Sequence, residues 1–426
     1  MLNASSISEF PGNGEQNSAK ATLGTILYVG GFELPDRNAA AQRVTANAKI
    51  FRALGYRVLL LGVTHQRSWP GGAPQPVEAG GEGMIGFEVP YPAGMKAWLH
   101  RISSPGPAAE VLRRAGVTDL VGVICYNHPA VAQARIAALA HSHGAWAAAD
   151  CTEWYAPSRM RGVASLIRNL DIPLRMRFVN KRMDALITTS PFISDYYRRA
   201  GQPIVEIPTL MDPPVLAPAD LMVKRTGGVT KLFFAGSGFD PAQVRNSTDG
   251  LKDRLDWVFE ALDAAHMHGA KFDLNLYGLD RDQYLALFPE HEPLLARLDG
   301  MYHFHGRCPR AELLSELTAA HFSIFFRSRT RTTLAGFPGK FSESIAFGTP
   351  VITNAMPSVA GFIEEGRSGF ALDTADLAAA GARIAEVFAM DDRAIADMKS
   401  WCAQSQLFDY GRYIEPVRTW LAAIRT

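Results

Sequence analysis

One pattern occurs twice in this chain: an apolar strand runs into glycine and is followed by a helix and a second apolar strand. The first copy starts at residues 25–31 (TILYVGG) and the second at residues 231–237 (KLFFAGS), about 200 residues later. After the first copy, the helical spacing of Val44, Ala48 and Phe51 predicts the helix. A strand, a glycine turn, a helix and a strand form a parallel βαβ unit. Two copies favour two tandem Rossmann-like domains, and one large doubly wound sheet is the alternative.

The length of the chain agrees with two domains, because single cores stop growing beyond about 250–300 residues and this chain has 426. Its 47% hydrophobic and 20% charged residues are typical of a globular protein. A net charge of +1 gives no global attraction to nucleic acid, so any basic surface must be local. No stretch approaches the roughly 20 apolar residues of a membrane helix, and the first residues lack the features of a signal peptide. We therefore expect a cytoplasmic protein.

A short helix is predicted to follow the loop GFPG at residues 336–339. Pro338 suits a first helical position and Gly348 suits the end. Lys340 and Glu343 lie one turn apart on the same face of this helix. The N–H groups of a helix start bind anions, and a vicinal diol can donate two hydrogen bonds to a carboxylate. A diphosphate at Lys340 and a ribose at Glu343 would satisfy both side chains, and an exposed ion pair between the two is the alternative.

Residues 335–354 (AGFPGKFSESIAFGTPVITN) resemble the nucleotide-sugar motif of the retaining glycosyltransferases of family 4, which have the GT-B fold. Four other segments resemble the family in the same order, and together they span most of residues 25–375. They are residues 30–61, 184–212, 304–326 and 362–372. The resemblance implies an α/β protein in which two tandem Rossmann-like domains face a central cleft. It also implies a C-terminal helix that crosses back to the N-terminal domain.

The sequence patterns and the resemblance together predict five regions along the chain. They are a disordered tail (1–22), an N-terminal Rossmann-like acceptor domain (23–212), a proline-rich linker (213–228), a C-terminal Rossmann-like domain for the nucleotide sugar (229–400) and a C-terminal helix that packs back on the N-terminal domain (401–426). The implied activity is retaining transfer of a sugar from a nucleoside-diphosphate sugar, linked to UDP or GDP, to a glycan or lipid-linked acceptor. We expect this reaction to serve polysaccharide or glycoconjugate biosynthesis.

The resemblance also assigns donor-binding residues. Glu343 would bind the ribose of the nucleotide, and Lys340 would lie near the donor sugar and its diphosphate. Lys252 would neutralise the β-phosphate, and Gly31 would let a loop of the first domain close over the phosphates. The backbone would approach the sugar and diphosphate at Gly336, Phe337 and Gly339.

Two positions depart from the family pattern. The first glutamate of the motif falls at Ala335, which lacks a carboxylate, and an arginine after the glycine of the second domain is replaced by Ser237. Arg327 or Arg329 would supply the missing charge, with Arg327 as our choice and a solvated basic loop as the alternative. These departures leave open a non-catalytic homologue that binds nucleotide sugar. A GT-B enzyme of the nucleotide-sugar epimerase type is the other alternative.

Two acids are candidates for the acceptor side. Asp150 ends an apolar strand and Glu153 follows three residues later, close to where the family has a histidine or an acid. We expect Asp150 to contact the acceptor hydroxyl or the donor sugar, with Glu153 as the second candidate. A helix cap is the alternative role for Asp150.

The expected chemistry requires stabilisation of a leaving diphosphate. Lys340, Lys252 and one arginine would provide it, because fixed positive charges act strongly in a dry site. No Asp-x-Asp motif precedes the cleft strands, so we expect no metal and no other cofactor. Lys340, Asp150 and Glu153 are therefore the predicted catalytic residues.

Two segments combine basic and apolar residues. They are residues 94–102 (GMKAWLHRI) and residues 157–184, which include seven arginines and lysines among Leu, Ile, Met and Phe. Such segments lie on anionic membranes or address a lipid-diphosphate acceptor. The alternative is a solvated face on two ordinary helices. Peripheral contact with the inner face of a membrane is thus a further expectation.

Overall fold

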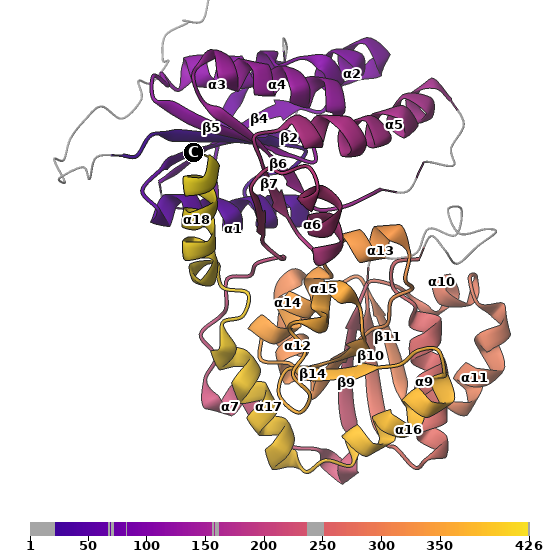
Figure 1. The fold of residues 1–426 in the computed structure, drawn as a ribbon. Helices are drawn as coiled ribbons and strands as arrows, with labels where there is room; N and C mark the ends of the chain where they lie inside the picture. The colour runs from indigo at the N-terminus through magenta and orange to yellow at the C-terminus, as the bar shows by residue number, and fades with distance from the viewer. Residues whose placement is uncertain are drawn as a thin grey trace, which may run out of the picture.

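The computed structural model describes residues 22–66, 69, 72–81, 83–155, 157, 162–236 and 251–424. Within them the chain forms two α/β domains, one above the other in Figure 1, each built on its own sheet. The alternative of one large sheet is therefore wrong. The expected tail falls almost wholly outside the described residues, as does Ser237.

The first sheet has eight strands in the order β3-β4-β2-β1-β5-β6-β7-β8, and all neighbours are parallel except β3 and β4. β1 lies in the middle and is buried along its whole length, which explains why its sequence is continuously apolar. The strands are β1 (Thr25–Gly30), β2 (Arg57–Thr64), β3 (Gln75–Val77), β4 (Met84–Pro90), β5 (Leu120–Tyr126), β6 (Trp146–Cys151), β7 (Ala185–Thr188) and β8 (Ile204–Glu206).

Helices cover both faces of the first sheet, and a separate apolar cluster forms under each layer. One cluster includes residues of α1, and the other includes residues of α3, α4 and α6. The helices are α1 (Ala39–Ala53), α2 (Gly94–Ser103), α3 (Gly106–Arg114), α4 (Ala130–Ser142), α5 (Val163–Leu174), which continues into a π-helical turn (Arg175–Val179), and α6 (Pro191–Arg198).

The second sheet is parallel, with the order β11-β10-β9-β12-β13-β14. Its strands are β9 (Thr230–Ala235), β10 (Phe272–Tyr277), β11 (Tyr302–Gly306), β12 (Phe322–Ile324), β13 (Val351–Asn354) and β14 (Gly369–Leu372). Its helices are α9 (Leu255–Met267), α10 (Arg281–Leu285), α11 (Glu292–Arg297), α12 (Arg310–Ala319), α13 (Arg331–Ala335), α14 (Gly339–Ala346), α15 (Pro357–Ala360), α16 (Leu377–Phe388) and α17 (Asp392–Ser405). The linker before this domain carries the short helix α7 (Pro218–Leu221).

The C-terminal helix α18 (Ile414–Ile424) returns to the first domain, as the fold class predicted (Figure 1). Trp420 packs in an apolar cluster of the first domain against Phe51 and Trp146, and its indole Nε1 donates to Pro203 O at 3.2 Å. The predicted boundary between residues 400 and 401 falls inside α17, which belongs to the second domain because Cys402 lies in that domain's core. The crossing therefore begins after α17.

Candidate functional site

Two groups of ion pairs form at the adjacent residues Lys252 and Asp253. Lys252 Nζ lies 2.9 Å from Glu153 Oε1, so this ion pair joins the second domain to the first. Lys340 Nζ donates to Asp253 Oδ2 at 2.7 Å, and Arg327 Nε donates to Asp253 Oδ1 at 3.0 Å. Of the three predicted donor cations, Lys252 thus pairs with the first domain, and Lys340 and Arg327 pair with its neighbour in sequence, Asp253.

The topology explains why these groups meet. Glu153 follows β6, Arg327 follows β12 and Lys340 is the second residue of α14. Lys252 and Asp253 precede α9, and Asp253 forms an isolated bridge with Arg327 that holds this segment beside the end of β12. Residues that follow parallel strands gather at one edge of a sheet, where open α/β sheets bind ligands.

Asp253 is the residue that sequence reasoning missed. Burial alone raises the pKa of a carboxyl group, but Lys340 and Arg327 bring the pKa of Asp253 down to about 2. Burial in turn lowers the pKa of Lys340, and Asp253 opposes that effect. The negative charge beside Lys340 is therefore, in this structure, a carboxylate of the protein. Its only sequence signal was an acid directly after the predicted Lys252.

Lys340 and Glu343 do not pair with each other in the described part of the chain, so that alternative is wrong. Glu343 Oε1 instead accepts from Nη2 of Arg310, the first residue of α12, at 2.8 Å. The side chain of Glu343 is 14% exposed and that of Arg310 is 50% exposed. Whether Glu343 binds a ribose stays a prediction, and Arg310 is a second residue that the sequence did not reveal.

The predicted glycines differ in their surroundings. Gly31 is exposed at the end of β1, and a Cβ built on it would meet nothing within 4 Å, so the backbone is accessible there. A Cβ built on Gly339 would lie 3.7 Å from Thr209 Cγ2, a residue of the segment that leads to the linker. Gly336 is buried, and its N–H donates to Thr332 O at 3.1 Å.

The ring of Phe337 packs among Phe341, Phe362 and Phe408. The ring of Phe337 is thus engaged in this aromatic group, and contact between its backbone and a ligand stays a prediction. Between the two candidate arginines, Arg327 lies in the charged group, whereas Arg329 Nη1 donates to Ala355 O at 3.1 Å.

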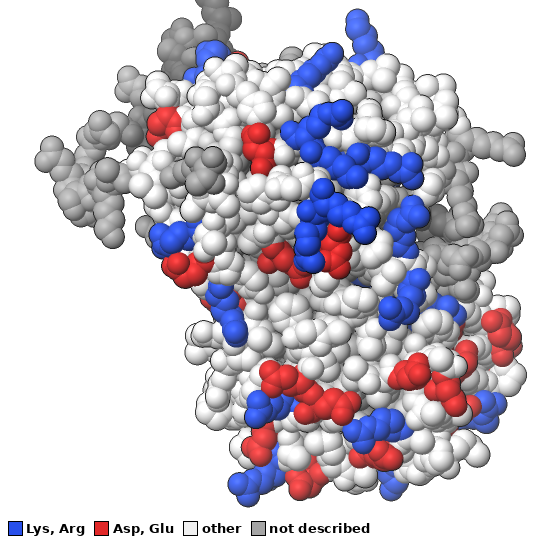
Figure 2. Space-filling view, in the orientation of Figure 1, with Lys and Arg blue, Asp and Glu red and all other residues white. Residues whose placement is uncertain are grey.

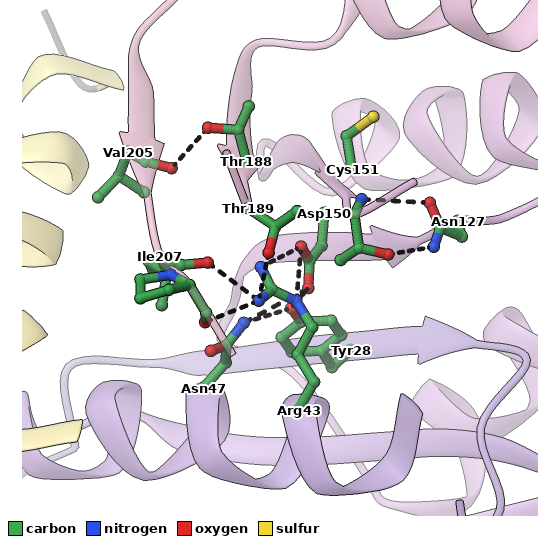
Figure 3. Close-up of polar contacts among 12 residues, drawn as sticks. Tyr28, Arg43, Asn47, Asn127, Asp150, Cys151, Thr188, Thr189, Val205 and Ile207 are labelled. Carbon is green, nitrogen blue, oxygen red and sulfur yellow. Dashed lines mark hydrogen bonds and ion pairs between the residues drawn. The ribbon is translucent and has the colours of Figure 1, made fainter. Parts of the chain in front are cut away.

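Asp150 is enclosed inside the first domain, so its carboxylate is not open to a substrate in this structure, and the predicted substrate contact is not supported by its surroundings (Figure 3). Asp150 is 1% exposed, and its carboxylate accepts hydrogen bonds from Arg43 Nη2 at 2.8 Å and from Tyr28 Oη at 2.5 Å. Arg43 Nη1 also donates to the carbonyls of Ile207 and Pro208 at 3.0 Å. The helix-cap alternative fails as well, because Asp150 lies inside β6.

The buried network around Asp150 has a structural role. It joins β1, α1 and β6 to residues 207 and 208, which follow the last strand of the first sheet. Burial lowers the pKa of Arg43, but Asp150 outweighs burial and raises it. Arg43 therefore keeps its positive charge, and both side chains of the pair are buried. Glu153 remains as the predicted acid that lies beside the other domain.

Ala335 lies at the contact between the domains. Its side chain is fully buried in an apolar cluster of the first domain, and its carbonyl accepts from Ser190 Oγ at 2.7 Å. Thr332 Oγ1, also in α13, donates to Trp154 O at 3.2 Å. The place of the family's glutamate is thus filled by a methyl group packed against the other domain.

Two surface hollows beside the linker do not coincide with the predicted site. Their volumes are about 690 and 450 Å³, and their linings include none of the predicted site residues. Across the described ranges, no group of three or more His, Cys, Asp or Glu side chains could hold a metal ion. The absence of a metal in catalysis stays a prediction. In the same ranges, no helix has the length and apolar character needed to cross a membrane.

Comparisons with known proteins bear on both domains. Residues 230–389 match the family described as glycosyl transferases group 1. No curated protein sequence matches the chain significantly. Lys252, Asp253, Arg310, Arg327, Lys340 and Glu343 all lie within the matched residues.

Solved structures resemble the whole chain. A trehalose-6-phosphate structure from E. coli, bound with UDP-2-fluoro glucose, has a TM-score of 0.64 at 10% identity and covers 94% of this chain and 99% of its own. Sucrose-phosphate synthase from Thermosynechococcus elongatus has a TM-score of 0.62 at 16% identity, with 94% and 100% covered. Anabaena HepE, in complex with UDP and glucose, has a TM-score of 0.56 at 14% identity, with 94% and 100% covered. The chain therefore has the GT-B fold, and its second domain matches the group 1 glycosyl transferases.

Proposed function

We propose that this protein is a retaining glycosyltransferase that moves a sugar from a UDP- or GDP-linked donor to a glycan or lipid-linked acceptor. The observation that carries the proposal is that Arg327 and Lys340 share the carboxylate of Asp253 beside the start of α14, while Lys252, the residue before Asp253, pairs across the domain boundary with Glu153. These cations lie within the residues that match the glycosyl transferases. Two of the similar structures hold UDP or a UDP sugar, which supports a nucleotide-sugar donor.

The charges of the site fit a diphosphate that replaces protein carboxylates. Lys252 is 48% exposed and pairs with Glu153 across the domain boundary. Exposed ion pairs contribute only about 0–1 kcal/mol, so a donor diphosphate can displace Glu153 from Lys252. Lys340 and Arg327 are held by Asp253 and would keep their places while the diphosphate approaches the helix start.

Donor binding would also prepare the acceptor side. Once the diphosphate holds Lys252, the carboxylate of Glu153 is released and faces the reacting sugar and the acceptor hydroxyl. Glu153 thereby takes the acceptor role first assigned to Asp150. The three cations then stabilise the negative charge that develops on the leaving diphosphate. Nothing in this scheme requires a metal ion, and we propose that activity persists in EDTA.

A thermal-shift experiment tests the donor site. UDP, GDP and ADP, each alone and with a sugar, should be compared by the rise in melting temperature, because ligands that bind the folded state stabilise it. The matching nucleotide should raise the melting temperature of the wild type, and Glu343→Ala should abolish the rise. Glu316→Ala is the matched control, because Glu316 also pairs with one cation, Lys231, in the same domain. A full response in Glu343→Ala would contradict the ribose role.

A non-catalytic binder of nucleotide sugars is the second candidate. It is favoured by Ala335, where a packed methyl group stands in place of a carboxylate. Hydrolysis of the donor without added acceptor separates the two candidates. Slow release of free sugar supports the enzyme, and the anomeric configuration of that sugar, followed by NMR, reports whether the transfer retains configuration. An epimerised donor would instead indicate the epimerase alternative.

A further inference from the structure

Helix α5 of the first domain carries a row of large apolar side chains that face solvent. Val163 is 64% exposed, Leu166 60% and Leu170 63%, and the row continues at Leu174 and Phe178. These residues are three or four positions apart, so they share one face of the helix. Only Ile172 of α5 is buried. Contiguous exposed apolar surface of this kind marks an interaction site.

Positive charge surrounds this apolar row. Figure 2 shows lysine and arginine gathered over the part of the first domain that α2, α4 and α5 occupy in Figure 1, with acidic side chains sparse there. The exposed cations here are Lys96 of α2, Arg135 of α4 and Arg168 of α5, followed by Arg177 in the π-helical turn after α5 and Lys181 and Arg182 in the 3-10 turn Asn180–Arg182. Asp171 is the one acid of α5, and its carboxylate accepts from the backbone N–H of Ala130 at 2.8 Å. It is therefore engaged at the start of α4.

Helix α2 extends the same type of surface. None of its residues is buried, and Met95 and Leu99 are exposed four positions apart. Arg135 of α4 donates to Ser103 O of α2 at 2.8 Å, and Asp171 ties α5 to the other end of α4. The two amphipathic helices are thus held on the same domain by α4, outside the contact with the second domain.

We propose that the apolar row of α5, with the cations around it, docks the protein on an anionic lipid bilayer. Apolar side chains of an interfacial helix enter the headgroup region while lysine and arginine contact anionic headgroups. A second copy of the chain fits this surface poorly, because a symmetric contact would set the same cations against one another. This inference does not depend on the proposed glycosyl transfer.

Vesicle flotation tests the docking surface with the full chain. Wild type should float with vesicles of phosphatidylglycerol and phosphatidylcholine and should not float with phosphatidylcholine alone. Salt at roughly 0.5 M screens surface charges, so it should release the bound protein from the vesicles. Two double variants, Leu166→Ser with Leu170→Ser and Arg168→Gln with Arg177→Gln, should each lower the bound fraction at least about fivefold.

Matched controls lie on the second domain. Met267→Ser removes another exposed apolar side chain, which is 76% exposed, and Lys271→Gln removes another exposed cation. Both controls should float like wild type, and all variants should keep the wild-type melting temperature because the side chains face solvent. The proposal is overturned if wild type fails to float, or if the double variants float as it does. It is equally overturned if the leucine variant only converts a dimer to a monomer in sedimentation, or if only an acidic protein partner binds the surface.

Discussion

At the scale of single residues, two carboxylates differ from what the sequence predicted. Asp253 was not foreseen and lies between Lys340 and Arg327, whereas Asp150 was foreseen as a substrate contact and is enclosed by Arg43 and Tyr28. Both acids neutralise buried cations. The difference is that Asp253 neutralises cations that a donor diphosphate would also approach.

Asp253→Asn should therefore separate stability from ligand response. Without the carboxylate, the two largely buried cations lose their partner, and unfolding should become easier by about 1–3 kcal/mol. A diphosphate can supply the missing negative charge, so the rise in melting temperature caused by UDP or GDP should be larger than in wild type. Asp263→Asn, which breaks the Asp263–Arg297 pair elsewhere in the same domain, should leave the nucleotide response unchanged. A smaller response in Asp253→Asn would show that Asp253 itself is needed for the nucleotide.

Asp150→Asn should act on stability alone. Removing one partner of a buried ion pair leaves Arg43 without its counter-charge, which typically costs about 3–5 kcal/mol. Urea unfolding should show this loss, while the nucleotide-induced shift in melting temperature persists because the donor cations belong to the second domain. Lost turnover with unchanged stability would instead restore the role of Asp150 in substrate contact.

At the scale of elements, α12, α14 and α17 support one another. Glu343 of α14 pairs with Arg310 at the start of α12. The end of α12 is held by Lys399 of α17, whose Nζ donates to the carbonyls of Thr318 and Ala320 at 2.8 and 2.7 Å. The position of the predicted ribose ligand thus depends on a helix whose last turn is capped by a fully buried lysine.

The buried Lys399 predicts a pH dependence of stability. Burial lowers its pKa from 10.5 to about 7 in the folded protein. Between these pH values the unfolded chain binds more protons than the folded one, so the contribution of Lys399 to stability rises with pH and is lost as pH falls through about 7. Urea unfolding should give the free energy of unfolding of wild type and of Lys399→Met at each pH. From pH 7 upward, this free energy should rise for wild type relative to Lys399→Met. A difference that stays constant with pH would contradict the lowered pKa.

At the scale of the whole molecule, several contacts join the two domains. They include the packing of α18, the ion pair of Glu153 and Lys252, and the burial of Ala335 in an apolar cluster of the first domain. Because Ala335 is enclosed by the first domain, α13 acts as a contact element between the domains. The family's glutamate would not fit there as the domains are arranged.

Ala335→Glu should therefore loosen the domain contact rather than restore a lost function. A carboxylate placed in an apolar cluster is costly to bury, so α13 should withdraw from α6. Small-angle X-ray scattering should show a larger radius of gyration, with little change in the unfolding of either domain. Ala389→Glu, at an exposed position after α16, is the control and should scatter like wild type. Unchanged scattering together with higher activity would show that Ala335 marks a true loss of a catalytic group.

Local sequence signals were sufficient for the architecture and for the position of α14. Continuous apolar strands, glycine turns and helical spacing act over a few neighbouring residues, so they predicted two Rossmann-like domains and a helix at GFPGK. The resemblance to the glycosyltransferases of family 4 then pointed to Lys252, Arg327 and Lys340. Their convergence followed from the topology of a parallel sheet.

Only the tertiary structure decided which charges meet. The partner of Lys340 lies 87 residues away in the chain, that of Glu343 33 residues away, and that of Asp150 107 residues away. No local pattern encodes such distances, because ion pairs between distant segments depend on how elements pack. The sequence by itself therefore determined the two domains and the helix α14. Packing determined that Asp150 is enclosed, that Asp253 pairs with Lys340 and Arg327, and that Ala335 is buried against the first domain.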